Sequence, residues 1–224
     1  MKKPIFTGCA VALITPFHEG EIDYPALGRL IDFQLTNGTD ALVACGTTAE
    51  PPALTEKEWE QLAAFIIQRA DGRVPVIVGT GGNCTRDVIR KAERARVLGA
   101  SAQLCVTPYY NKTTQAGLIA HYTAVAQAAE LPVILYNVPS RTGLNLQPDT
   151  LARLAEEENI VAVKEASGDM IQIMEMMRLC GDKIAFYSGS DELTAPLMAL
   201  GGQGGISVAA NIIPHLMWEM THCP

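Results

Sequence analysis

The chain has 224 residues, of which 48% are hydrophobic and 18% are charged, and its formal net charge is −7. This balance is typical of a soluble globular protein and excludes the basic surface that nucleic acid or an anionic membrane requires. The start of the chain lacks the long apolar segment of a secretory signal, and no apolar run is long enough to span a membrane. We therefore expect a cytoplasmic protein that binds neither nucleic acid nor membranes.

Cysteine and histidine usage agrees with this expectation. The six cysteines form no C-x-x-C pair, and Cys9, Cys45 and Cys105 lie in apolar runs. Such thiols are typical of reduced, structural cysteines in the cytoplasm. The four histidines lack the spacing of metal ligands, so we expect no metal site and disfavour a zinc-dependent aldolase.

Eight short apolar runs follow one another along the chain, separated by segments with helical periodicity. They occupy residues 9–15, 41–46, 74–80, 101–107, 132–137, 160–166, 184–189 and 204–211. Short aliphatic runs that alternate with helices are typical of parallel strands joined by right-handed crossovers. Because eight such units close a barrel, the sequence predicts one (β/α)8 TIM-barrel domain over residues 1–224.

Several of the intervening segments carry signals for helix ends. Asp23 is a suitable N-cap with Pro25 in the first turn, and Thr55 with Glu58 forms a capping-box pattern. Gly99 follows a run of periodic apolar positions, as expected of a helix C-terminus. After the last apolar run only two or three helical turns remain, so the eighth helix is predicted to be incomplete.

A doubly wound open sheet is the competing fold. It requires a G-x-G-x-x-G loop after an early strand, and residues 79–83 do not fit that pattern. The glycine-rich segment 201–205 invites interpretation as a phosphate site. However, it precedes the last strand and so lies opposite the catalytic face of a barrel, and we expect a plain turn there.

Two residues at the ends of neighbouring runs indicate covalent chemistry. Lys164 is the only one of seven lysines inside an apolar run. Burial of an ammonium group carries a desolvation cost that calls for a function. Tyr136 ends the preceding run. A lysine whose charged form is disfavoured, beside a phenol that can move protons, indicates Schiff-base chemistry on a carbonyl.

Other polar groups also fall at the carboxyl ends of the predicted strands. They lie in Thr15–Phe17, Gly46–Glu50, Thr107–Asn111, Tyr136–Gly143 and Ser188–Asp191. Each alone has a structural explanation: a tight turn for Thr47 and Thr48, rim packing for the tyrosines, and a surface charge for Arg141. Because all of them fall at one face of the barrel, we expect them to share a site.

Four strings carry a resemblance to a known family: GTTAE (46–50), VTPYYN (106–111), LYNVPSRTG (135–143) and VKEASG (163–168). They resemble the dihydrodipicolinate synthase family of the class I aldolase superfamily, and the resemblance runs from about Phe6 to Asn211. It implies a lyase of lysine and diaminopimelate biosynthesis. Such a lyase condenses pyruvate with L-aspartate 4-semialdehyde to 4-hydroxy-tetrahydrodipicolinate and uses no metal or organic cofactor.

The resemblance also implies catalytic roles. Lys164 corresponds to the lysine that forms the imine with pyruvate. Tyr136, Thr47 and Tyr110 correspond to a proton relay in which the Tyr110 position is supplied by the neighbouring subunit. The implied assembly is a homodimer or homotetramer.

Substrate-binding positions follow from the same resemblance. Thr48 and the backbone around Ile206 correspond to groups that hold pyruvate, and Gly189 is a further substrate contact. Arg141 corresponds to the guanidinium that binds the carboxylate of the aldehyde, a task suited to its bidentate fork. The matching loop of N-acetylneuraminate lyases lacks this arginine, so Arg141 favours a small carboxylated aldehyde over a sugar.

The resemblance also bears on regulation and on the C-terminal part of the chain. Asn83, Asp87 and Tyr109 correspond to an allosteric lysine site, but Glu56 and Trp59 replace histidines of that site. The family also continues past the barrel into a C-terminal helical region, so we expect a C-terminally shortened member. Its last apolar side chains (Ile213, Leu216, Met217, Met220) are expected to lack some of their intended cover. The alternatives are another pyruvate-dependent aldolase, acting on N-acetylneuraminate or a 2-keto-3-deoxy acid, and an inactive truncated barrel.

Overall fold

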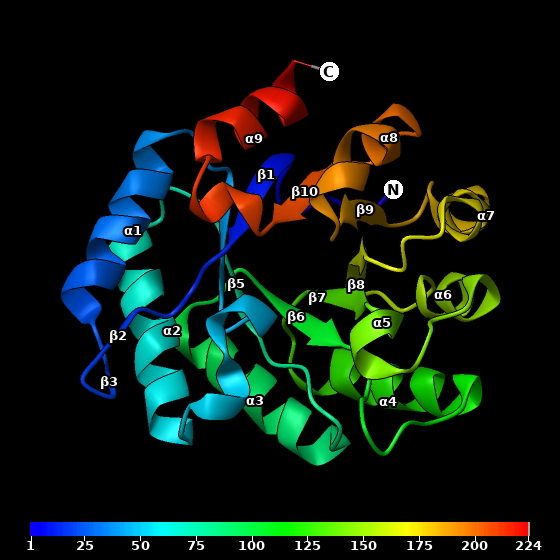
Figure 1. The fold of residues 1–224 in the computed structure, drawn as a ribbon. Helices are drawn as coiled ribbons and strands as arrows, with labels where there is room; N and C mark the ends of the chain where they lie inside the picture. Colours follow the sequence, from blue (N-terminus) through cyan, green and yellow to red (C-terminus); the bar gives the residue numbers. More distant parts are fainter. Residues whose placement is uncertain (224) are drawn as a thin grey trace.

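The computed structural model describes residues 1–223 and contains a closed barrel of eight parallel strands within a ring of helices (Figure 1). The barrel strands are β1 (Gly8–Ala12), β4 (Ala41–Ala44), β5 (Val76–Gly79), β6 (Ala102–Val106), β7 (Val133–Asn137), β8 (Ile160–Glu165), β9 (Ala185–Ser188) and β10 (Gly204–Ser207). Strand β1 pairs with both β10 and β4, which closes the ring. Each strand overlaps one of the eight apolar runs, so the predicted barrel is confirmed.

Helices and short turns connect the strands. The helices are α1 (Tyr24–Thr36), α2 (Glu56–Ala70), α3 (Thr85–Leu98), α4 (Gln115–Ala128), α5 (Pro139–Thr142), α6 (Pro148–Leu154), α7 (Met170–Cys180), α8 (Thr194–Ala199) and α9 (Pro214–His222). Four 3-10 turns, η1 (Thr47–Ala49), η2 (Pro51–Ala53), η3 (Asp191–Leu193) and η4 (Ala209–Asn211), follow strands at the carboxyl end of the barrel. A small hairpin, β2 (Phe17–His18) with β3 (Glu21–Ile22), was not predicted.

The helix ends follow the predicted signals. The Asp23 side chain accepts the Ala26 N–H at 2.8 Å at the start of α1. Thr55 and Glu58 form both hydrogen bonds of a capping box on α2. Gly99 ends α3 with a φ of 95°, a left-handed conformation that glycine adopts without a steric cost. These three predictions are confirmed.

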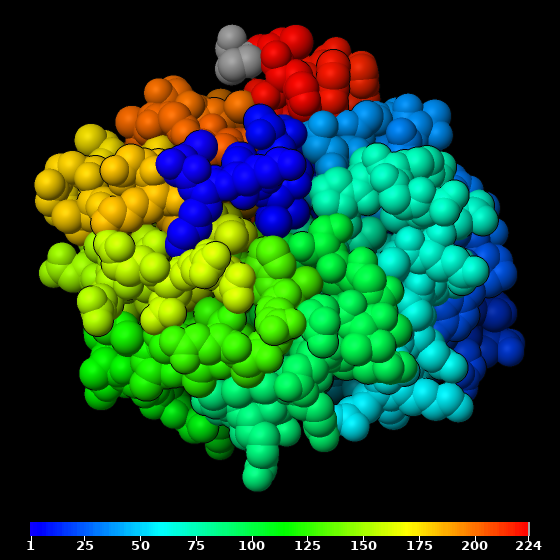
Figure 2. Space-filling view, turned by 180° about the vertical axis from the view of Figure 1, so that it is seen from behind, coloured from blue at the N-terminus to red at the C-terminus, as the bar shows by residue number. Residues whose placement is uncertain are grey.

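The amino end of the barrel is closed by the first residues of the chain. Figure 2 shows them in blue, against the yellow segment that leads into β8. The Lys2 ammonium donates to the carbonyls of Ala155 and Ile160 at 2.8 and 2.9 Å. The Phe6 ring stacks on Tyr187 with 4.3 Å between ring centroids. The opposite, carboxyl end therefore remains as the open face of the barrel.

Burial of the apolar side chains in and just before α9 differs in part from the expectation. Ile213 and Leu216 are 43% and 57% exposed, as expected for side chains without cover. Met217 is only 6% exposed, because it packs into the core between the barrel and α1, so the expectation is wrong for this residue. Met220 is partly buried against the same core, as expected for a side chain with incomplete cover. Residues 201–203 form the turn before β10, and the predicted turn in this segment is confirmed. Within residues 1–223, no helix has the length and apolar character needed to cross a membrane.

Candidate active site

The site is centred on a direct pairing between two strands. The register of β7 and β8 places Tyr136 opposite Lys164, and both side chains point into the barrel. The Lys164 Nζ lies 4.4 Å from the centroid of the Tyr136 ring. Lys164 is 5% exposed and Tyr136 is 6% exposed. The meeting of phenol and amine that the sequence predicted is therefore confirmed.

Burial sets the protonation of this pair. Desolvation is the main cause that lowers the pKa of Lys164 to about 8; the Asp191 carboxylate opposes the shift and Arg141 adds to it. Burial also raises the pKa of Tyr136, against the opposing effects of Arg141 and the Thr47 hydroxyl. At neutral pH an appreciable fraction of Lys164 is therefore the neutral amine, which is the nucleophilic form, beside a protonated phenol.

A cavity of about 430 Å³ opens over the pair at the carboxyl end of the barrel. Six of the eight predicted catalytic and substrate-binding residues line it: Thr47, Thr48, Tyr136, Arg141, Lys164 and Gly189. Ile206 does not line the cavity; it is packed in the barrel interior and is 1% exposed. The cavity combines a nucleophile, hydroxyl groups and a cation, which is a suitable set for binding and activating a keto acid.

Local structure explains how Thr47 and Arg141 reach the cavity. Thr47 begins the turn η1, which the Thr15 hydroxyl anchors by donating to the Ala49 carbonyl at 2.8 Å. Arg141 lies on the single turn α5, which Pro139 starts and Gly143 ends with a φ of 67°. Both turns begin within three residues of a strand end, so short segments carry the two side chains.

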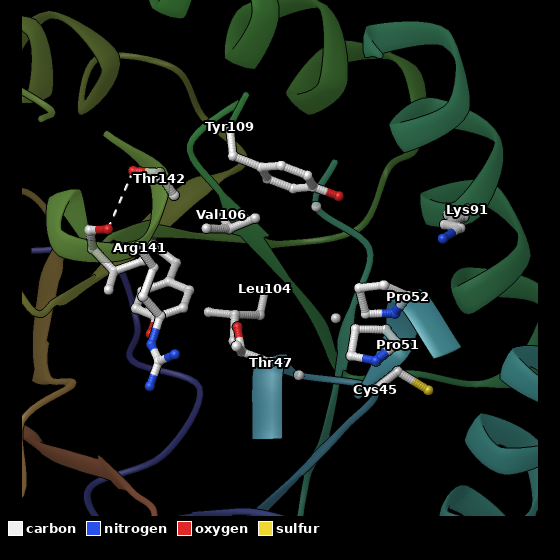
Figure 3. A pocket seen from close by; sticks show the side chains of 15 residues that line it. Cys45, Thr47, Pro51, Pro52, Lys91, Leu104, Val106, Tyr109, Arg141 and Thr142 are labelled. Carbon is white, nitrogen blue, oxygen red and sulfur yellow. Dashed lines mark hydrogen bonds between the residues drawn. The ribbon is translucent and has the colours of Figure 1, made fainter. Parts of the chain in front are cut away.

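A second cavity, of about 250 Å³, is drawn in Figure 3 and shares lining residues with the first. Thr47, Tyr136 and Arg141 line both cavities. Figure 3 shows the Tyr109 ring over the second cavity and Pro51, Pro52 and Lys91 on the side away from Arg141. The proline-rich turn η2 thus forms one wall of the second cavity.

The predicted lysine-site residues do not all reach this second cavity. Tyr109 lines it, whereas Asn83 and Asp87 do not. The Asn83 carbonyl accepts a hydrogen bond from the Asn111 side chain at 3.3 Å. Asp87 lies in the first turn of α3, 3.5 Å from the guanidinium of Arg90. The allosteric lysine site stays a prediction.

Tyr110 points away from the site of its own chain. It is 91% exposed, lines neither cavity and has a φ of 66°, a strained left-handed conformation for a bulky residue. Within this chain only two members of the predicted relay, Thr47 and Tyr136, are brought together. Tyr110 is instead presented to solvent.

Asp191 is a site residue to which the sequence assigned no role. It follows β9, lines the larger cavity, and accepts the backbone N–H of Ala209 at 2.9 Å. Its position after the Ser-Gly strand end was the only available signal. Among residues 1–223, no cluster of His, Cys, Asp or Glu side chains is suited to a metal ion.

Comparisons with known proteins agree with this geometry. A sequence model of the Dihydrodipicolinate synthetase family matches residues 5–223. The 4-hydroxy-tetrahydrodipicolinate synthase of Trichlorobacter lovleyi is 52% identical over 97% of this chain and 75% of its own length. The crystal structure of dihydrodipicolinate synthase from Aquifex aeolicus has a TM-score of 0.93 at 50% identity, covering 96% of this chain and 73% of that one. A monomeric dihydrodipicolinate synthase variant has a TM-score of 0.95 at 42% identity, over 97% of this chain and 74% of its own.

Proposed function

Because this chain belongs to the dihydrodipicolinate synthetase family, we propose that it condenses pyruvate with L-aspartate 4-semialdehyde to give 4-hydroxy-tetrahydrodipicolinate. It is a lyase of the class I aldolase type. The observation that carries the mechanism is Lys164, a buried amine whose pKa is about 8 and which lies beside Tyr136 in an open cavity.

The first half of the reaction forms the imine. The neutral Lys164 amine attacks C2 of pyruvate, and the carbinolamine loses one water to give a protonated imine. Tyr136 is suited to donate the proton that leaves with this water, since burial keeps its phenol protonated. Loss of a proton from the pyruvate methyl group then gives the enamine. Thr47 and Thr48 line the cavity where the pyruvate carboxylate and the proton relay are to be placed.

The second half forms the carbon–carbon bond and the ring. The enamine carbon attacks the aldehyde carbon of the semialdehyde, and the aldehyde oxygen takes up a proton. Arg141, at the cavity wall, is suited to bind the semialdehyde carboxylate through its two-pronged guanidinium. The amino group of the semialdehyde then attacks the imine carbon and displaces Lys164. One water is released in all and the lysine is regenerated, so the cycle requires no cofactor.

A neighbouring subunit is part of the proposal. Tyr110 is 91% exposed and held in a strained backbone conformation, which supports a role in a partner's site. We propose a homodimer or homotetramer in which Tyr110 completes the relay of the adjacent subunit. Exposed apolar side chains on α7, Ile171 at 81% and Met174 at 54%, are compatible with burial against further subunits.

A substrate panel tests the proposed reaction. The enzyme is incubated with pyruvate and aspartate semialdehyde, and separately with N-acetylneuraminate and 2-keto-3-deoxy acids in the cleavage direction. The proposal predicts that turnover is fastest with aspartate semialdehyde. Faster cleavage of a sugar acid would assign the chain to the other aldolases. Absence of turnover with every substrate, from folded protein, would favour an inactive barrel.

A further inference from the structure

A buried carboxylate lies directly behind the site. Asn137 and Glu165 are paired across β7 and β8, one residue after Tyr136 and Lys164. Because side chains alternate along a strand, this second pair points out of the barrel. Asn137 is 0% exposed and Glu165 is 1% exposed. Burial of a carboxylate without a cation is costly, and none of the salt bridges within residues 1–223 involves Glu165.

Hydrogen bonds compensate this carboxylate. Its Oε2 accepts from the Asn137 side-chain amide at 3.0 Å, and its Oε1 accepts from the Ser167 backbone N–H at 2.6 Å. Burial raises the pKa of Glu165, whereas the hydrogen bonds from Ser167 and Asn137 lower it. Each oxygen thus faces a donor, and the bond to Asn137 joins the carboxyl ends of β7 and β8.

Asn137 is also hydrogen-bonded to the end of the loop that carries Arg141. Its Oδ1 accepts the Leu146 N–H at 2.9 Å, and its Nδ2 also donates to the Asn145 Oδ1 at 2.9 Å. The chain leaves β7 at Asn137, forms α5 with Arg141, and returns to Asn137 at residues 145 and 146. The loop is therefore closed at its base by one side chain.

A glutamine on α7 completes the network. The side-chain amides of Asn145 and Gln172 donate to each other at 2.7 and 3.1 Å. We call Asn137, Asn145, Glu165 and Gln172 the amide–carboxylate junction. It connects two strands, a loop and a helix through side chains alone. None of its members lines the larger cavity.

We infer that Glu165 is a positioning residue: its carboxylate orients Asn137, and the junction thereby fixes Tyr136, Lys164 and Arg141 relative to one another. Four hydrogen-bonded groups that meet behind the site hold the ends of both reactive strands and the base of the arginine loop. A change in this junction acts on the reaction without touching substrate. The inference rests on the proposed function, since it assigns all three residues to one reaction.

The Glu165→Gln variant tests the inference. The new amide has one donor group, which must face either the Asn137 amide or the Ser167 N–H, and both of these are donors. We expect a folded protein in which the strand ends shift. Because a misplacement of about 1 Å costs roughly 100-fold in rate, kcat should fall by about that factor. KM for pyruvate should change far less than kcat, since the groups that contact pyruvate remain.

A second variant exchanges the donor and the acceptor of the hydrogen bond between positions 137 and 165. In N137D/E165Q, the amide at position 165 can donate to the carboxylate at position 137 while it still accepts from Ser167. The Asn145 and Gln172 amides can turn over together to give that carboxylate a donor. We expect at least about tenfold recovery of kcat over E165Q. N137D alone places two carboxylates face to face and should remain the least active of the three.

Glu157→Gln is the matched control. Glu157 precedes β8 at the opposite end, and its carboxylate also accepts a hydrogen bond, from the Thr123 hydroxyl at 2.9 Å. The same chemical change there should leave kcat at the wild-type value. All variants are compared per folded molecule, with folding checked by circular dichroism and thermal unfolding.

Two results would overturn the inference. One is folded E165Q with wild-type kcat. The other is a folded N137D/E165Q variant whose kcat is no higher than that of E165Q. If E165Q does not fold, the contradicting result is a folded N137D/E165Q variant whose kcat is more than about tenfold below that of wild type. Borohydride trapping of pyruvate on the wild-type enzyme distinguishes failure of the inference about Glu165 from failure of the proposed function. No adduct on Lys164 of wild type contradicts the proposed function itself, whereas a normal wild-type adduct with unaffected E165Q contradicts only the role of Glu165.

Discussion

The Lys164 nitrogen lies 4.4 Å from the centroid of the Tyr136 ring, and the two residues are paired directly across β7 and β8. Two effects compete in this geometry. The face of the ring attracts the ammonium form, whereas burial disfavours any charge. Desolvation by burial is the largest effect on the pKa of Lys164, which is lowered to about 8. The barrel interior therefore makes a nucleophile of a lysine that would be fully protonated in water.

The rate of imine formation should follow this pKa. The neutral amine attacks, so the rate of pyruvate trapping should rise with pH and level off above about 8. Initial trapping rates between about pH 6 and 11.5 measure the inflection. An inflection near the ordinary lysine pKa of about 10.4 would show that burial does not lower the pKa of Lys164.

Two carboxylates near Lys164 provide a test and a control for the pH dependence of trapping. Asp191 raises the pKa of Lys164, so Asp191→Asn should move the inflection to lower pH. Glu192 lines the same cavity but does not contribute to the shift, so Glu192→Gln should leave the inflection in place. Equal shifts in both variants would argue against a specific effect of Asp191.

Arg141→Lys should impair the second substrate selectively. The change keeps the positive charge near Lys164 but removes the bidentate fork. Loss of a charged hydrogen bond costs about 1.5–3 kcal/mol, so kcat/KM for aspartate semialdehyde should fall by about 10- to 150-fold. Pyruvate trapping should be unchanged. A parallel loss of trapping would place Arg141 in the first half-reaction instead.

Mixed subunits test the exchange of Tyr110. Lys164→Ala lacks the nucleophile and Tyr110→Phe lacks one hydroxyl of the relay, so each homodimer should have little activity. In a mixed dimer, the site with an intact Lys164 receives an intact Tyr110 from its partner. Random mixing makes half of the dimers mixed, so about one quarter of the sites should recover. No recovery, with mixed dimers verified by native mass spectrometry, would mean that Tyr110 serves its own chain.

The buried His121 should make the fold sensitive to acid. It is 6% exposed, its Nδ1 lies 2.8 Å from the Thr85 hydroxyl, and its Nε2 has no hydrogen-bond partner within residues 1–223. Burial lowers its pKa. The unfolded chain, with a histidine pKa of about 6.5, therefore takes up a proton before the folded chain does. Stability is complete above about pH 6.5 and decreases as pH falls from there toward the lowered pKa.

Thermal unfolding at several pH values measures this loss. His121→Gln should reduce the decrease of Tm in acid, because the titrating group is gone. His215→Gln is the matched control, since the His215 side chain is 61% exposed. An unchanged pH dependence in the His121 variant would show that other groups are responsible.

The barrel and the centre of the site could be predicted because their signals are local. Each strand is a short apolar run, and its last residues reach the open end of the barrel. Strand order then places Tyr136 beside Lys164 without any knowledge of side-chain contacts. The helix caps at Asp23 and Thr55 could also be predicted, because each capping side chain bonds a group only three residues further along the chain.

Other features depend on contacts that no local pattern encodes. The hairpin β2–β3 has two residues per strand, too few for a periodic signal. Burial of Met217 depends on packing between distant elements. The amide–carboxylate junction joins residues up to 35 positions apart, and Glu165 is recognisable only once the β7–β8 register is known. The role that we propose for Tyr110 in a neighbouring subunit rests on the family resemblance and not on a local pattern in the chain.

Borohydride trapping tests directly whether Lys164 forms the imine with pyruvate. The protein is incubated with pyruvate, reduced, digested, and searched for the added mass by peptide mass spectrometry, with Lys164→Ala as the control. We expect a single adduct on the peptide that contains Lys164, and none in the variant. An adduct on Lys91, which lines the second cavity, or no adduct on folded wild-type protein, would contradict this expectation.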